Sequence, residues 1–100
     1  MNERVAWLAY DFTVYPATGV TWGDVGGVYI FAGHNPQNQW QAYYVGQTES
    51  FQRRLPGHER WKEAARMGAT DIHARVVQQA LSRDAIEREL IHAFQPPLNT

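Results

Sequence analysis

The sequence has 100 residues, a formal net charge of −1 and 44% hydrophobic residues. This length suits one small domain with a single core, and the hydrophobic fraction excludes an intrinsically disordered chain. No apolar run approaches the ~20 residues that span a bilayer, no secretory signal is recognisable, and the absence of cysteine excludes disulfides and thiolate metal sites. We therefore expect a cytoplasmic protein without membrane contact.

Basic residues are concentrated in one segment of this slightly acidic chain. Residues 50–66 carry five basic side chains against two acidic ones. A local cationic surface on a nearly neutral protein can position phosphates without high non-specific affinity. A solvated helix face is the alternative explanation. The candidates for contact with nucleic acid are Arg53, Arg60 and Lys62.

The N-terminal segment 5–15 predicts a strand. Its apolar residues also fit a helix, but its aromatic and β-branched content and the following Pro16 favour a strand. The residues expected on its core face are Leu8, Tyr10, Phe12 and Val14. Residues 16–27 contain four glycines and a proline, which is typical of a loop. If the aromatic residues of 5–15 are exposed, a protein-interaction module remains an alternative.

Two further strands are predicted at residues 28–32 and 40–45, which are rich in aromatic and β-branched residues. The polar segment 33–39 between them is typical of a hairpin loop. The two strands should therefore be antiparallel neighbours, an arrangement that would bring Tyr29 close to Tyr44.

Ser50 predicts the start of a helix, because its hydroxyl can accept a hydrogen bond from an amide of the first turn. On a helix from Phe51, Arg54 and His58 would share a face. Pro56 lacks an amide hydrogen and clashes with the preceding turn, so the helix should kink there or restart at Pro56. Helix is then predicted as far as Met67, with Gly68 as its stop.

The C-terminal part predicts a third core strand at residues 71–78 and a helix that Ser82 caps and that runs to about Phe94. Glu87 falls inside the apolar stripe of this helix at about 100° per residue. A carboxylate that faces a core is costly unless it is paired, hydrogen-bonded or bound to a metal. A buried Glu–Arg pair and a metal-binding or catalytic carboxylate are the two explanations.

Six short motifs follow one another across residues 26–99: Gly27-Val28-Tyr29, Tyr44-Val45-Gly46, Arg54, His58, Glu87 ahead of Leu90-Ile91, and Pro96-Pro97-Leu98-Asn99. In their order and approximate spacing, these motifs resemble the GIY-YIG nuclease family. The resemblance implies a small α/β (α+β) domain with a central three-stranded antiparallel sheet flanked by helices. It places the nuclease domain at 26–100 and leaves 1–25 as an N-terminal extension with an additional strand and a loop.

The resemblance also implies a metal-dependent endonuclease that hydrolyses phosphodiester bonds in DNA, as relatives do in repair and restriction. Glu87 would hold one Mg²⁺ or Mn²⁺, and Arg54 would clamp the scissile phosphate. Tyr29 would be the general base for the attacking water, and Tyr44 and His58 would orient it or relay its proton. Gly46 and Asn99 would support the site.

A catalytically inactive nucleic-acid-binding module of the same fold is the competing hypothesis. The proline in the helix that bears Arg54 and the modest net charge favour it, whereas a competent residue at every titratable position of the motif opposes it. No second domain for target choice is recognisable. We therefore expect that the protein forms a homodimer, uses residues 1–25 for recognition, or depends on a separate targeting protein.

Overall fold

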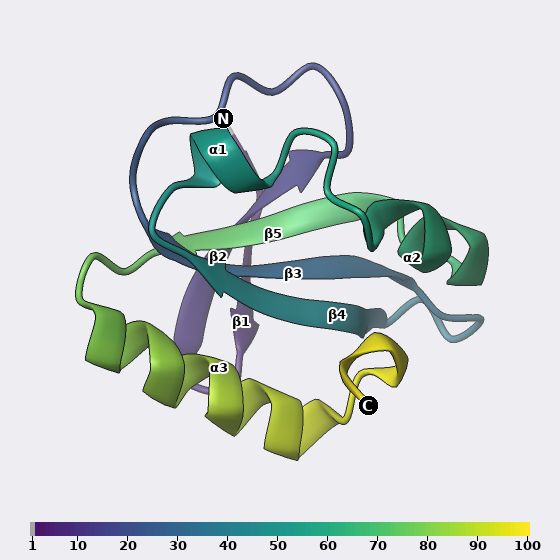
Figure 1. The fold of residues 1–100 in the computed structure, drawn as a ribbon. Coiled ribbons are helices and arrows are strands. Elements are labelled where there is room, and N and C mark those ends of the chain that lie inside the picture. Colours follow the sequence, from purple (N-terminus) through teal and green to yellow (C-terminus); the bar gives the residue numbers. More distant parts are fainter. Residues whose placement is uncertain (1) are drawn as a thin grey trace.

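The computed structural model of this protein describes residues 2–100. They form one five-stranded antiparallel sheet, in the order β1-β2-β5-β3-β4, with helices on both faces (Figure 1). In chain order the elements are β1 (Arg4–Trp7), β2 (Tyr10–Pro16), β3 (Gly27–His34), β4 (Trp40–Thr48), α1 (Phe51–Arg54), α2 (Trp61–Met67), β5 (Asp71–Val76), α3 (Ala80–Phe94) and the short 3₁₀ helix η1 (Pro97–Asn99). The predicted α+β class is confirmed, but the sheet has five strands rather than three.

The two additional strands come from the N-terminal segment, for which the sequence predicted one strand. β1 and β2 pair as a tight hairpin, and Leu8 takes the turn with a φ of 57°. Leu8 is therefore 45% exposed and does not join the core, whereas Trp7 and Phe12 are buried. Tyr10 and Tyr15 of the same segment remain partly exposed, so the alternative of a protein-interaction module built on its aromatics stays a prediction.

β3 and β4 form the predicted antiparallel hairpin, with Tyr29 opposite Gly46 and Phe31 opposite Tyr44. β5 lies between β2 and β3 and so occupies the centre of the sheet. It ends at Val76, which is 58% exposed rather than part of the core. All but the last residue of β3 are buried, because helices cover both faces of the sheet.

Alternate residues of β3 serve two separate hydrophobic clusters. One side packs against Ile86 and Leu90 of α3. Tyr29 and Phe31 point to the other side, where Phe51 of α1 packs with them. Figure 1 shows the same division, with α3 below the sheet and α1 above it. Tyr29 therefore faces the α1 side of the sheet.

The helical region after β4 differs from the prediction. Ser50 caps α1 as expected, and its side chain accepts from the Arg53 amide. The helix ends at Arg54, however, and helix does not resume until Trp61. Pro56 cannot donate to the turn before it, so residues 55–60 form turns instead. Arg54 and His58 consequently do not share a helix face. The predicted stop is confirmed, because Gly68 ends α2 with a φ of 127°.

α3 begins three residues earlier than predicted. Its N-cap is Gln79, without a side-chain capping bond, rather than Ser82. The buried Arg83 reaches back from the first turn, and its Nη1 donates to the carbonyl oxygens of Val77 and Gln78. This contact, rather than a hydroxyl cap, ties the chain before the helix to its first turn. Within residues 2–100 no helix is long and apolar enough to cross a membrane.

Candidate active site

Tyr29 is the centre of the site. Its hydroxyl lies 2.8 Å from Nε2 of His58, and its ring lies across Gly46 of the neighbouring strand. A Cβ at position 46 would come within 2.4 Å of both Cζ and Oη of Tyr29. Glycine at this position is therefore a steric requirement for the observed position of the tyrosine.

The hydrogen bonds of His58 define its tautomer. The backbone amide of Arg60 donates to Nδ1 at 3.0 Å, so the proton of the neutral ring is on Nε2. Nε2–H then donates to the oxygen of Tyr29. Burial, helped by the charges of Arg54 and Arg60, lowers the pKa of His58 to about 4. At neutral pH the ring is therefore an uncharged donor that points at the tyrosine oxygen.

The surroundings of Tyr29 oppose its ionisation. Burial raises the pKa of Tyr29 above its usual value, and the Tyr44, Glu59 and Glu87 groups raise it further. The charge of Arg54 acts in the opposite direction. A phenolate at Tyr29 consequently needs additional positive charge nearby or a further hydrogen-bond donor.

Tyr44 contributes a second phenol on the same side of the sheet. Its ring centroid lies 6.3 Å from that of Tyr29 and 5.4 Å from that of His58. Phe31 packs against Tyr44 and His58. The rings of Tyr29, Tyr44 and His58 thus pack together around Phe31, and His58 lies between α1 and α2 rather than on the predicted helix.

Arg54 is engaged by a neighbouring carboxylate. Its Nη1 and Nη2 each donate to one oxygen of Glu59 at 2.7 Å. Glu59 lies largely in solvent, and its hydrogen bonds with Arg54 lower its own pKa to about 2. A phosphate that uses the same two donors must displace Glu59.

Glu87 is half-buried on α3, and within residues 2–100 it forms no ion pair; the buried Glu–Arg pair considered from the sequence is absent. Burial raises its pKa, the Gln47 side chain lowers it and the Asp84 charge raises it. A bound cation would offset the cost of this partly desolvated charge. The described residues contain no group of three or more His, Asp or Glu that could hold a metal. The remaining ligands would therefore be water and phosphate oxygens, the coordination that Mg²⁺ commonly retains.

Three residues beside Glu87 were not singled out from the sequence. Gln47 of β4 donates from Nε2 to Asp84 of α3 and accepts from Nε of Arg83 at 3.3 Å. This network joins the edge strand to the helix that carries Glu87. Arg83 and Asp84 precede Glu87 by about one helical turn, and this spacing could have identified them as its neighbours. Nothing in the sequence pairs Gln47 with them.

Asn99 binds the backbone of the edge strand β4. Its Nδ2 donates to the carbonyl of Val45 at 2.8 Å, and its Oδ1 accepts from the Val45 amide at 2.8 Å. The side chain thus occupies the position that a further strand would take. It holds the backbone between Tyr44 and Gly46.

The cationic residues lie close to carboxylates. Arg60 donates to Glu63 at 2.9 Å, and Arg53 lies 3.9 Å from Asp24 and from Glu49. The surplus of positive charge in 50–66 is therefore partly neutralised in space. Lys62 lines a cavity of about 710 Å³ with His58 and Trp61, next to the site.

Comparisons with solved structures identify the same fold in the GIY-YIG N-terminal endonuclease domain of UvrC from Thermotoga maritima. The magnesium-bound structure has a TM-score of 0.64 and 22% identity, and the match covers 79% of this chain and 88% of that chain. A tyrosine-to-phenylalanine point mutant of the same domain, bound to its catalytic divalent cation, gives a TM-score of 0.62 at 24% identity, over 79% and 87% of the two chains. An asparagine-to-alanine mutant gives a TM-score of 0.61 at 22% identity, over 76% and 83%.

In comparisons with sequences, no protein-family model and no curated protein matches this chain. The likeness to known proteins therefore lies in the shared architecture, and this architecture agrees with the motifs in the sequence. This chain has the fold of the GIY-YIG endonuclease domain.

Proposed function

We propose that this protein is a metal-dependent endonuclease that hydrolyses phosphodiester bonds in DNA. The observation that carries the proposal is the hydroxyl of Tyr29, held 2.8 Å from Nε2 of His58 and above Gly46, in the fold of an endonuclease domain that binds a catalytic divalent cation. We assign the nuclease domain to residues 26–100 and treat residues 1–25 as its N-terminal extension.

In this proposal Tyr29 removes the proton of the attacking water. His58 donates from Nε2 to the tyrosine oxygen and so orients it and stabilises its phenolate. His58 does not take the tyrosine proton, because the nitrogen that faces the tyrosine, Nε2, already carries a proton. Its Nδ1 is the unprotonated nitrogen and accepts from the Arg60 amide. Tyr44 lies beside both rings and completes the polar surroundings of the oxygen.

Glu87 is the residue proposed to hold Mg²⁺ or Mn²⁺, which supplies Lewis-acid stabilisation of charge on the phosphate when bound. Arg54 is proposed to bind the scissile phosphate through the two donors that Glu59 now occupies. Asn99 and Gly46 keep the β4 backbone in place beneath Tyr29. Arg53, Arg60 and Lys62 are proposed to contact flanking phosphates.

An inactive nucleic-acid-binding module is the second candidate. The observation in its favour is that burial raises the pKa of Tyr29 while Glu59 occupies Arg54. Such a module would bind DNA whether or not Glu87 is intact. Either candidate would take its target specificity from residues 1–25, from a second copy of the chain or from a separate targeting protein.

Nicking of supercoiled plasmid tests the proposal. Wild-type protein with Mg²⁺ or Mn²⁺ should relax the plasmid, and EDTA should prevent relaxation. Glu87→Gln and Tyr29→Phe should both abolish it, whereas Glu89→Gln, an exposed position on the same helix, should retain it. DNA binding without cleavage by the wild-type protein would reject the endonuclease in favour of the inactive module.

A further inference from the structure

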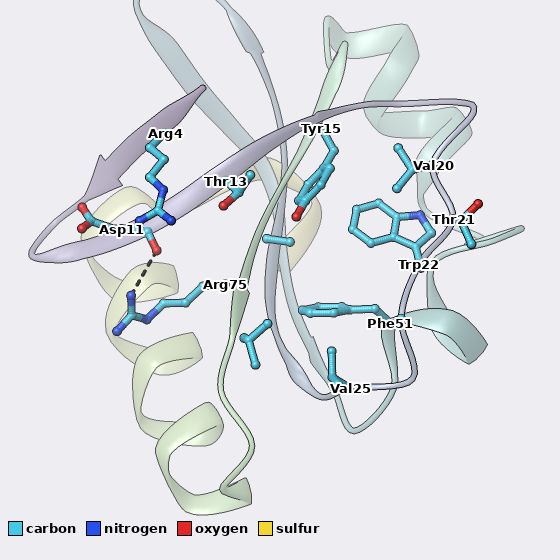
Figure 2. A pocket seen from close by; sticks show the side chains of 13 residues that line it. Arg4, Asp11, Thr13, Tyr15, Val20, Thr21, Trp22, Val25, Phe51 and Arg75 are labelled. Atoms are coloured by element: carbon cyan, nitrogen blue, oxygen red, sulfur yellow. Dashed lines mark hydrogen bonds between the residues drawn. The ribbon is translucent and has the colours of Figure 1, made fainter. Parts of the chain in front are cut away.

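A second cavity lies on the sheet face that carries Tyr29, over β2 and β5. It has a volume of about 360 Å³, and we call it the β2–β5 pocket. The side chains that define it are Arg4, Tyr15, Trp22 and Phe51 (Figure 2). Three of these four precede residue 26 and so lie outside the segment that resembles the nuclease family.

One side of the pocket is aromatic. The ring centroid of Trp22 lies 4.9 Å from that of Tyr15 and 5.9 Å from that of Phe51. Phe51 is buried, whereas Trp22 and Tyr15 remain partly exposed. The rim continues as Val25 and Val76, which are 36% and 58% exposed. This wall can accept a flat, apolar group from solvent.

The opposite side carries Arg4 and Asp11, as Figure 2 shows. Arg4 is exposed and forms no ion pair within residues 2–100. Arg75 borders the pocket, but its register partner is Val28, so its side chain points to the α3 side of the sheet. There its guanidinium lies 5.6 Å from the ring centroid of Tyr10, and its Nη1 donates to the carbonyl oxygen of Asp11 at 3.1 Å. The carboxylate of Asp11 also lines the pocket. The guanidinium of Arg4 is thus available to an anion across the pocket from the indole.

The register of the sheet relates this pocket to the candidate active site. Arg4 pairs with Thr13, Thr13 with Ala74, and Ala74 with Tyr29. Residues paired in this way present their side chains on the same face. Strands lie about 4.8 Å apart, so Tyr29 and Arg4 are separated by roughly 14 Å along one row. The small side chains of Thr13 and Ala74 occupy the row between them.

We propose that the β2–β5 pocket binds one unpaired nucleotide of the DNA strand next to the cleavage site. The base stacks on Trp22, and the phosphate contacts Arg4. A paired base cannot present its face to a side chain, so the pocket selects single-stranded DNA or an unpaired end beside a duplex. This assignment rests on the proposed endonuclease function, because it takes Tyr29 as the position of the scissile phosphate.

Fluorescence anisotropy in EDTA, with a short fluorescein-labelled oligothymidylate and a blunt duplex as probes, tests the pocket without cleavage. Trp22→Ala should weaken binding of the oligothymidylate by about 5- to 100-fold and leave duplex binding unchanged. Arg4→Gln should weaken binding a few-fold and reduce the salt dependence by about one charge. Asp11→Asn should strengthen binding, and Arg66→Gln, an exposed arginine of α2 outside the pocket, is the control.

Unchanged oligothymidylate affinity in Trp22→Ala, or an equal loss for the duplex, would overturn the pocket. If Trp22→Ala proves unstable in urea, the exposed Arg4→Gln decides, and an unchanged affinity and salt dependence would then reject the proposal. The two proposals fail separately. If the wild-type protein nicks plasmid but the pocket variants bind the oligothymidylate normally, only the pocket proposal is rejected. If the pocket variants lose oligothymidylate binding selectively but the wild-type protein does not nick plasmid, only the endonuclease proposal is rejected.

Discussion

Two buried histidines should make the stability of this fold depend on pH. Burial lowers the pKa of both His58 and His73 from 6.5 to about 4. His73 is fully buried on β5, where Nδ1 accepts from Nε1 of Trp7 at 2.9 Å and Nε2 has no partner among residues 2–100. The nearby charges of Asp71 and His34 act on it in opposite directions. Both rings are therefore neutral in the folded protein at neutral pH.

The sign follows from proton binding. Below about pH 6.5 the unfolded chain protonates both rings, whereas the folded chain does so only near pH 4, so the free energy of unfolding falls as the pH falls through this window. At about 1.4 kcal/mol per pKa unit, each histidine contributes roughly 3 kcal/mol that is present above pH 6.5 and lost near pH 4. The sum is comparable with the total stability of a small domain. The raised pKa of Glu87 opposes the trend in part.

Urea unfolding at a series of pH values between about 4 and 7.5 measures this dependence. The midpoint should fall steadily below pH 6.5 at constant m, and His73→Gln should remove about half of the slope. His92→Gln, which replaces an exposed histidine of α3, should leave it unchanged. A flat midpoint across the window, or an undiminished slope in His73→Gln, would refute the argument that burial keeps these rings neutral.

Three further changes test the packing of the site. Gly46→Ala should lower the free energy of unfolding by about 1–3 kcal/mol and abolish nicking, because the added Cβ would overlap the ring of Tyr29. The control is Gly23→Ala, whose added Cβ meets only an ordinary contact at 3.9 Å. It should behave as wild type in the same urea and plasmid assays. Asn99→Ala should lower the free energy of unfolding in urea by roughly 1–3 kcal/mol, because two backbone groups of β4 lose their partners. A variant as stable as the wild type would show that water replaces the side-chain amide. Glu59→Gln should tighten duplex binding in an anisotropy titration a few-fold by freeing the arginine that it holds, and weaker binding would mean that the pair positions that arginine.

Features that depend on local chemistry were predictable from the sequence. The β3–β4 hairpin follows from two aromatic and β-branched runs around a polar loop. Ser50 and Gly68 mark helix ends by capping and by a positive φ, and both act where expected. The helical period placed Glu87 within an apolar stripe, and the structure shows it half-buried. The roles of the motif residues in catalysis remain predictions.

Features that depend on distant partners were decided only by the tertiary structure. The β1–β2 turn was missed because Leu8, not glycine, takes the positive φ, and that strain is tolerated once strand pairing and core burial compensate for it. The helix expected to align Arg54 with His58 does not exist, yet the fold brings His58 to Tyr29 through turns that no periodicity describes. The side chain of Asn99 binds the backbone of Val45, 54 residues away in the sequence. β1 and the segment between β2 and β3 bring Arg4 and Trp22 to the same face as the site. Spacing along the chain sets which residues share an element, whereas only the order and register of the strands set which elements meet.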